Sequence, residues 1–179
     1  MDILPRRFQG GSVDSIDTSK SKYYQRGFKW CVRYLEHNNI KGDILDPFAR
    51  SCDWGDITND LDADYNTTFN LDCLDFLKKM KDSSAKLILF DPPFSDAMNA
   101  RKYKGSSNLY ASDTSKISQC QKQFKRILKP GGLVIKLGYN SGRPIGLELI
   151  STTCVNFGGN RNDVIMSIWQ RKDSNLFEF

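Results

Sequence analysis

Short apolar runs alternate with amphipathic segments along most of the chain. Runs rich in β-branched and aromatic residues predict strands at 43–46, 56–62, 86–90, 133–137, 152–157 and 164–170. Apolar residues that recur three or four positions apart predict helices at 22–38, 70–80, 115–129 and 145–150. This alternation indicates an α/β protein with a mostly parallel sheet that is covered on both faces. The last two runs are joined by Gly158-Gly159-Asn160, which predicts an antiparallel hairpin.

The length of 179 residues predicts one domain. Residues 1–20 are polar and rich in Gly, Ser and Asp, so we expect a flexible lead-in before a single domain over 21–179. Five scattered cysteines without a Cys-x-x-Cys pair favour free thiols in a reducing, cytoplasmic compartment, and we expect no metal site. The single histidine, His37, argues against Ser-His-Asp and Cys-His catalysis. No apolar run is long enough to span a bilayer, so we expect no membrane partner.

Acidic residues stand at the ends of three successive predicted strands. They are Asp46, Asp60 or Asp62, and Asp91. Because ligands bind at the carboxyl ends of the strands in open α/β sheets, these side chains predict a binding site at that edge.

The segment Asp91-Pro92-Pro93-Phe94 combines a carboxylate, two rigid backbone angles and an aromatic ring in one turn. Neither proline has an N–H group, so the turn offers carbonyl oxygens that can accept a hydrogen bond. A planar exocyclic amine fits such a set, since it needs acceptors in its plane and a flat face to stack on. The alternative is a proline turn that ends a strand, with Phe94 packed in the core.

The net charge of +5 is unevenly distributed. Between Asn99 and Lys129 there are eight basic residues and one acid, Asp113. The stretch 95–113 is long, rich in Gly, Ser and Asn, and mixes Arg101, Lys102 and Lys104 with tyrosines. Long loops of this kind are usually functional, and interleaved charge and rings suit a nucleic acid partner. A solvated loop followed by a lysine-rich helix face is the alternative interpretation.

The order of these segments resembles the S-adenosylmethionine-dependent N6-adenine DNA methyltransferases, in particular the small stand-alone phage and virus type. The resemblance rests on Asp46-Pro47-Phe48, Thr58-Asn59-Asp60-Leu61, Leu71-Asp72-Cys73-Leu74-Asp75-Phe76-Leu77, Asp91-Pro92-Pro93-Phe94, Leu128-Lys129-Pro130-Gly131-Gly132 and Gly159-Asn160-Arg161-Asn162-Asp163. It implies a Rossmann-like class I methyltransferase fold with a mostly parallel seven-stranded sheet and an antiparallel C-terminal hairpin strand. It also implies S-adenosyl-L-methionine as cofactor, DNA as partner and, for a phage or virus, a location in the host cytoplasm.

The resemblance assigns roles to individual residues. Asp46, Pro47 and Phe48 would lie beneath the cofactor, Asp60, favoured over Asp62, would accept its ribose hydroxyls, and Asp72 would accept its adenine amine. Asp91 and the carbonyl of Pro92 would accept the two N–H bonds of the target amine, beside Pro93. Phe94 would stack on a flipped or single-stranded base. Arg101, Lys102 and Lys104 would contact the nucleic acid.

The chain departs from the family in two ways. Arg50 and Cys52 stand at two positions where the first loop usually has glycine. We also expect no separate target-recognition domain, which implies relaxed specificity, a specificity subunit or a homodimer. Three alternatives to DNA methylation stay open: adenine methylation of RNA, protein glutamine methylation, and a catalytically inactive nucleic-acid-binding subunit. The glutamine reading is the weakest, because that family prefers Asn where this chain has Asp91.

Overall fold

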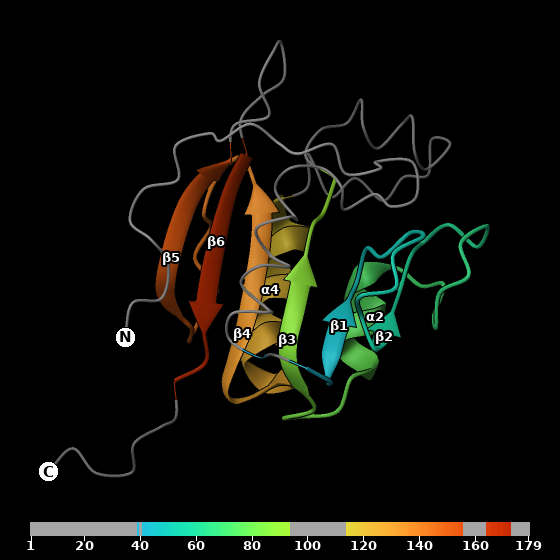
Figure 1. The fold of residues 1–179 in the computed structure, drawn as a ribbon, viewed down its shortest axis with the longest axis horizontal. Helices are drawn as coiled ribbons and strands as arrows, with labels where there is room; N and C mark the ends of the chain where they lie inside the picture. Colours follow the sequence, from blue (N-terminus) through green and yellow to red (C-terminus); the bar gives the residue numbers. More distant parts are fainter. Residues whose placement is uncertain (1–38, 40, 94–113, 156–163, 173–179) are drawn as a thin grey trace, which may run out of the picture.

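The computed structural model describes residues 39, 41–93, 114–155 and 164–172. Its elements, in chain order, are β1 (Ile44–Asp46), β2 (Ile57–Thr58), α2 (Cys73–Lys79), β3 (Ala85–Phe90), α4 (Thr114–Ile127), β4 (Leu128–Gly138), β5 (Glu148–Val155) and β6 (Val164–Gln170). The strands form one sheet in the order β2-β1-β3-β4-β6-β5 (Figure 1). Neighbouring strands from β2 to β4 are parallel, and β6 is antiparallel to both β4 and β5. The predicted α/β sheet and its C-terminal hairpin strands are therefore confirmed.

The described residues form six strands, where the family resemblance implies seven. The outer side of β2 is nevertheless occupied, because Phe69 forms an isolated parallel bridge with Asn59. The backbone N–H of Phe69 donates to the carbonyl of Thr58 at 3.0 Å, and that of Asp60 donates to the carbonyl of Phe69 at 3.2 Å. A single bridge thus takes the edge position that a seventh parallel strand would occupy.

Two sequence predictions in the C-terminal half are wrong. The helix expected at 145–150 is absent, because Glu148 and Leu149 already belong to β5 and pair with Gln170 and Trp169 of β6. The strand expected at 133–137 begins earlier, at Leu128, so Pro130-Gly131-Gly132 lies inside β4, and the register between β3 and β4 shifts there. The predicted lead-in, the helix at 22–38, the loop at 95–113 and the hairpin turn lie outside the described residues.

The central strand β3 is buried on both faces of the sheet. On the face that carries α2 and α4, Ile88 and Phe90 pack in the larger core cluster, and Phe90 makes edge contacts with Phe124 at 4.9 Å between ring centroids (Figure 1). On the other face, Leu87 and Leu89 join a second cluster. Burial on both faces is expected of a parallel strand, whose sequence is then continuously apolar. Asp91 therefore follows directly after a strand that is held rigidly in the core. No helix of the described part of the chain is both long and apolar enough to cross a membrane.

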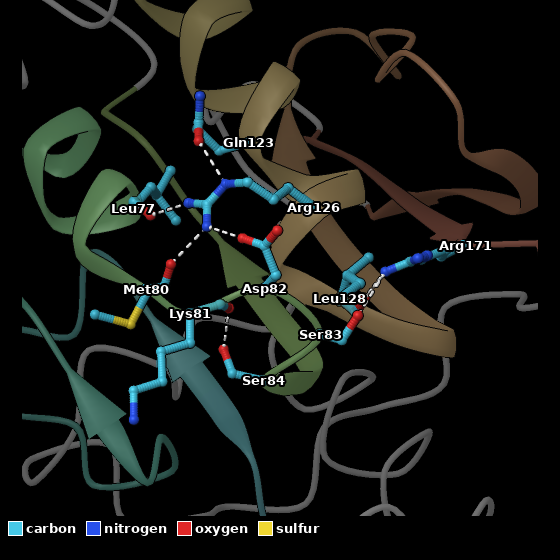
Figure 2. Close-up of polar contacts among 10 residues, drawn as sticks. All are labelled: Leu77, Met80, Lys81, Asp82, Ser83, Ser84, Gln123, Arg126, Leu128 and Arg171. Carbon is cyan, nitrogen blue, oxygen red and sulfur yellow. Dashed lines mark hydrogen bonds and ion pairs between the residues drawn. The ribbon is translucent and has the colours of Figure 1, made fainter.

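A polar cluster fastens α2 to α4 at the amino-terminal edge of the sheet, opposite the predicted site (Figure 2). The guanidinium of Arg126 donates to the carbonyls of Leu77 and Met80 at 3.0 and 2.6 Å, and it forms an ion pair with Asp82 at 2.6 Å. Helices end with unsatisfied carbonyls, which cations satisfy well. Arg126 thus closes the C-terminus of α2 and fixes the turn that leads into β3.

Candidate functional site

Three strand ends meet at the carboxyl edge of the sheet. Because β1 lies between β2 and β3, Asp46 at the end of β1 has the residues that follow β2 on one side and those that follow β3 on the other. Asp60 and Asp91 are among those residues, at the edge to which the arrowheads of β1 and β3 point in Figure 1. The topology therefore brings these predicted site residues to one edge.

The turn after β1 is stabilised by contacts among its own buried side chains and the neighbouring core. Asp46 is fully buried and its Oδ1 accepts the backbone N–H of Phe48 at 3.1 Å. The ring of Phe48 packs edge-on against Phe90, with centroids 5.5 Å apart. The side chains of Asp46 and Phe48 thus shape the turn, and Pro47 between them is buried as well. Any contact of this turn with a ligand would come from its backbone.

Asn59 joins three segments of the site, and the sequence analysis assigned it no role. Its Nδ2 donates to the carbonyls of Pro47 and Leu71 at 3.1 and 3.0 Å, and its Oδ1 accepts the N–H of Leu71 at 3.0 Å. Its backbone also receives the N–H of Ala49 at 2.8 Å. An amide side chain can donate and accept at once, which a bridge between two backbones requires. The signal was its position within Thr58-Asn59-Asp60, directly after β2.

The first loop keeps a glycine-like course without the glycines. Arg50 has a φ of +50°, in the left-handed region, and its N–H donates to Oδ2 of Asp60 at 3.0 Å. The side chain of Cys52 is buried in the second core cluster. At Arg50 the loop therefore has the left-handed backbone conformation that glycine favours, and Cys52 packs into the core.

Asp60 and Asp62 differ in what their carboxylates already do. Asp60 is 1% exposed, and its two oxygens accept the N–H groups of Arg50 and Asp62, the latter at 3.1 Å. Asp62 is partly exposed, and its Oδ1 accepts the N–H of Asp64 at 3.0 Å. Asp60 is thus a brace for the loop in this structure, and Asp62 is the more accessible of the two carboxylates.

Asp72 stands at the N-terminus of α2. Its Oδ1 accepts the N–H of Leu74 at 3.0 Å as the helix N-cap. Its Oδ2 lies 4.0 Å from Nζ of Lys116 in the first turn of α4. Two hydrogen bonds join Asn59 to Leu71, so Asp72 is held close to the residues that follow β2. The next residue, Cys73, is buried, and burial raises the pKa of its thiol well above the usual value.

The segment Asp91-Pro92-Pro93 follows β3 directly. Asp91 is partly exposed and both prolines are buried. Phe90, the last residue of β3, lies between the rings of Phe48 and Phe124, so the turn begins from a fixed point. Four further predicted residues, Phe94, Arg101, Lys102 and Lys104, lie outside the described residues.

Lys136 is a buried cation beside this turn, and the sequence analysis missed it. It pairs with Phe90 across the β3–β4 ladder and is 4% exposed. Its Nζ donates to the backbone carbonyl of Asn140 at 2.7 Å. Burial lowers the pKa of Lys136 to about 8. The signal was a lysine inside the apolar run 133–137, where a solvated charge is out of place.

Comparison with solved structures identifies the fold as that of the class I methyltransferases. NodS from Bradyrhizobium japonicum WM9, an N-methyltransferase in complex with S-adenosyl-L-homocysteine, is 10% identical, with a TM-score of 0.57 over 87% of this chain and 90% of its own. TrmN from Thermus thermophilus is 16% identical, with a TM-score of 0.54 over 85% of this chain and 53% of its own. HI0767 from Haemophilus influenzae, described provisionally as a methylase, is 15% identical, with a TM-score of 0.53 over 84% and 99%.

The sequence itself matches no family model, and no curated protein is significantly similar to it. At these identities the structural similarity establishes the fold, while the chemistry has to be argued from the site.

Proposed function

We propose that this chain is an S-adenosylmethionine-dependent methyltransferase that transfers a methyl group to the exocyclic N6 amine of adenine in DNA. The observation that carries the proposal is the Asp91-Pro92-Pro93 turn, which leaves the buried strand β3 at the carboxyl edge, one strand from Asp46. A carboxylate and carbonyl oxygens that project from a rigid strand end are the acceptors that an aromatic amine requires.

The residues at this edge also suit a nucleoside cofactor. Arg50 has the left-handed backbone that glycine favours, and Cys52 is packed in the core. Asp62 after β2 and Asp72 at the start of α2 are partly exposed carboxylates that could accept from hydroxyl and amino groups. When bound, S-adenosylmethionine supplies an electrophilic methyl group on its sulfonium sulfur. NodS supports this choice, since its fold is shared and it was solved with the demethylated cofactor.

In this proposal, Asp91 acts by position and charge. Its carboxylate accepts one N–H of the target amine, and the carbonyl of Pro92 accepts the other. Both hydrogen bonds draw the nitrogen lone pair out of conjugation with the ring and direct it at the methyl group. The new N–C bond forms as the bond between sulfur and the methyl carbon breaks, and the nitrogen then loses one proton, which the carboxylate of Asp91 would accept. The chemistry needs no covalent intermediate with the protein.

Two rival functions share part of this argument. Methylation of adenine in RNA would use the same amine and the same turn. An inactive nucleic-acid-binding subunit would keep the fold without using the cofactor. The shared fold of TrmN does not decide between them.

Calorimetry with S-adenosylmethionine, followed by transfer of a labelled methyl group to DNA, RNA and protein pools, separates these functions. We expect micromolar to millimolar cofactor binding and label in DNA adenine. If the label appears in RNA alone, the substrate is RNA in place of DNA and the proposed reaction is unchanged. Absence of cofactor binding by the folded wild-type protein would refute the proposal that the chain is an enzyme.

A further inference from the structure

The first loop and the segment after β2 carry more exposed acidic side chains than basic ones. Residues 46–66 contain six aspartates and a single basic residue, Arg50. Asp46 and Asp60 are buried, and the carboxylate of Asp56 accepts the N–H of Ile44 at the start of β1. The remaining three, Asp53, Asp62 and Asp64, are exposed or partly exposed. A surface of this charge attracts cations and repels polyanions such as nucleic acids. S-adenosylmethionine fits it, because its sulfonium and ammonium groups outweigh its one carboxylate.

Arg50 is held in a defined place at the edge of this acidic surface. Its backbone is fixed by the hydrogen bond to Asp60, in the left-handed conformation that glycine adopts without strain. Its Nε donates to the hydroxyl of Tyr65 at 3.3 Å, and its guanidinium carbon lies 5.6 Å from the centre of the Tyr65 ring. Arg50 and Tyr65 are both partly exposed.

The geometry leaves the end of the guanidinium available for a ligand. Tyr65 engages Nε, and no described residue accepts a hydrogen bond from the two terminal nitrogens. A planar fork of N–H donors is the group that recognises a carboxylate with two parallel hydrogen bonds.

We propose that Arg50 binds the carboxylate of the cofactor's methionine part, in place of the backbone contacts that a glycine at this position would make. The inference rests on the proposed function, since it names a ligand contact for that same site. The turn from Asp46 to Arg50 is the segment expected beneath the methionine part, so the contact is local to it. The accessible carboxylates of Asp53, Asp62 and Asp64 make a phosphate of the nucleic acid the poorer anion for Arg50, because the rest of the nucleic acid backbone would be repelled.

A matched pair of ligands isolates this contact. Decarboxylated S-adenosylmethionine keeps the adenosine, the sulfonium and the ammonium group, and lacks only the carboxylate. By calorimetry, Arg50→Gly should bind S-adenosylmethionine about 10- to 100-fold more weakly than the wild type, the usual size of a charge-assisted pair. The same substitution should change the affinity for the decarboxylated ligand by less than about threefold. Arg50→Lys should fall between, because it keeps the charge and loses the fork.

Stability and a control variant complete the test. Arg50→Gly should melt at or above the wild-type temperature, since glycine relieves the positive φ. Lys78→Ala removes one positive charge from an exposed position on α2 and should leave both affinities unchanged. Equal weakening of both ligands by Arg50→Gly, or no weakening of either, would overturn the proposal. Weakened DNA binding with unchanged cofactor affinity would also overturn it. If the wild type binds neither ligand, the proposed function fails together with the inference.

Discussion

Removal of the Arg126 guanidinium should be among the most damaging single changes to this fold (Figure 2). The group makes charge-assisted hydrogen bonds to the carbonyls of Leu77 and Met80 and an ion pair with Asp82, and it also donates to Gln123 at 3.2 Å. The Asp82 side chain is 73% exposed, so that pair contributes little. A hydrogen bond from a charged donor contributes about 1.5–3 kcal/mol, and water can replace part of it at this partly exposed position. We therefore expect Arg126→Ala to lower the free energy of unfolding by about 2–4 kcal/mol.

The assay is urea denaturation with a thermal melt in parallel. For a protein of this size, the expected loss corresponds to a melting temperature lower by about 4–16 °C. Asp82→Ala and Gln123→Ala remove one partner each and should cost less than about 1 kcal/mol. The reasoning would be refuted by an Arg126→Ala variant as stable as the wild type. It would also be refuted if Asp82→Ala cost as much as Arg126→Ala, since the energy would then lie in the ion pair and not in the closure of α2.

Three further perturbations probe the site and its supports. A Cβ at Gly55 would lie 2.9 Å from the Cβ of Asp46, so Gly55→Ala should cost about 1–3 kcal/mol in urea denaturation, and unchanged stability would contradict the packing. Burial lowers the pKa of Lys136 from 10.5 to about 8. Between pH 8 and 10.5 the unfolded chain therefore binds more protons than the folded one, so the free energy of unfolding should rise with pH in this range. Lys136→Met should abolish this rise in thermal melts from pH 7 to 10. The hydrogen bond from Lys129 lowers the pKa of Asp43, so its contribution is present above pH 3.8 and lost in acid, and Asp43→Asn should reduce the acid sensitivity measured below pH 4.

The sequence predicted the parts of the fold that depend on local pattern. The apolar run that became β3 was found where expected, and α2 lies within the helix predicted at 70–80, because burial leaves a strong periodic signal. The helix predicted at 145–150 failed because its pattern is also compatible with a strand. Pairing with β6, through contacts such as Leu149 with Trp169, decided the outcome. Such pairing joins residues that are far apart in the sequence, so no local pattern contains it.

In the candidate site, too, features with a local sequence pattern could be predicted, and features that depend on distant segments could not. The acidic ends of the strands were visible as residue types that follow apolar runs. The roles of Asn59 and Asp60 as braces depend on backbone groups of distant segments, such as the carbonyl of Leu71 and the N–H of Arg50. Whether the chain can pass through position 50 as it would with a glycine could be learned only from the φ of Arg50, because that angle is in the left-handed region.

Methyl transfer by the Asp91 variants is the measurement that tests the central claim most directly. The substrate is an adenine-containing DNA with label in the cofactor's methyl group, and Asp75→Ala, which removes an exposed carboxylate on α2, is the matched control. Asp91→Ala should reduce transfer about 100-fold or more, as expected for the loss of a group that acts in the transition state, while cofactor affinity stays within about threefold of the wild type. Asp75→Ala should transfer like the wild type. Full transfer by Asp91→Ala would contradict the assignment of this turn as the site of the target amine.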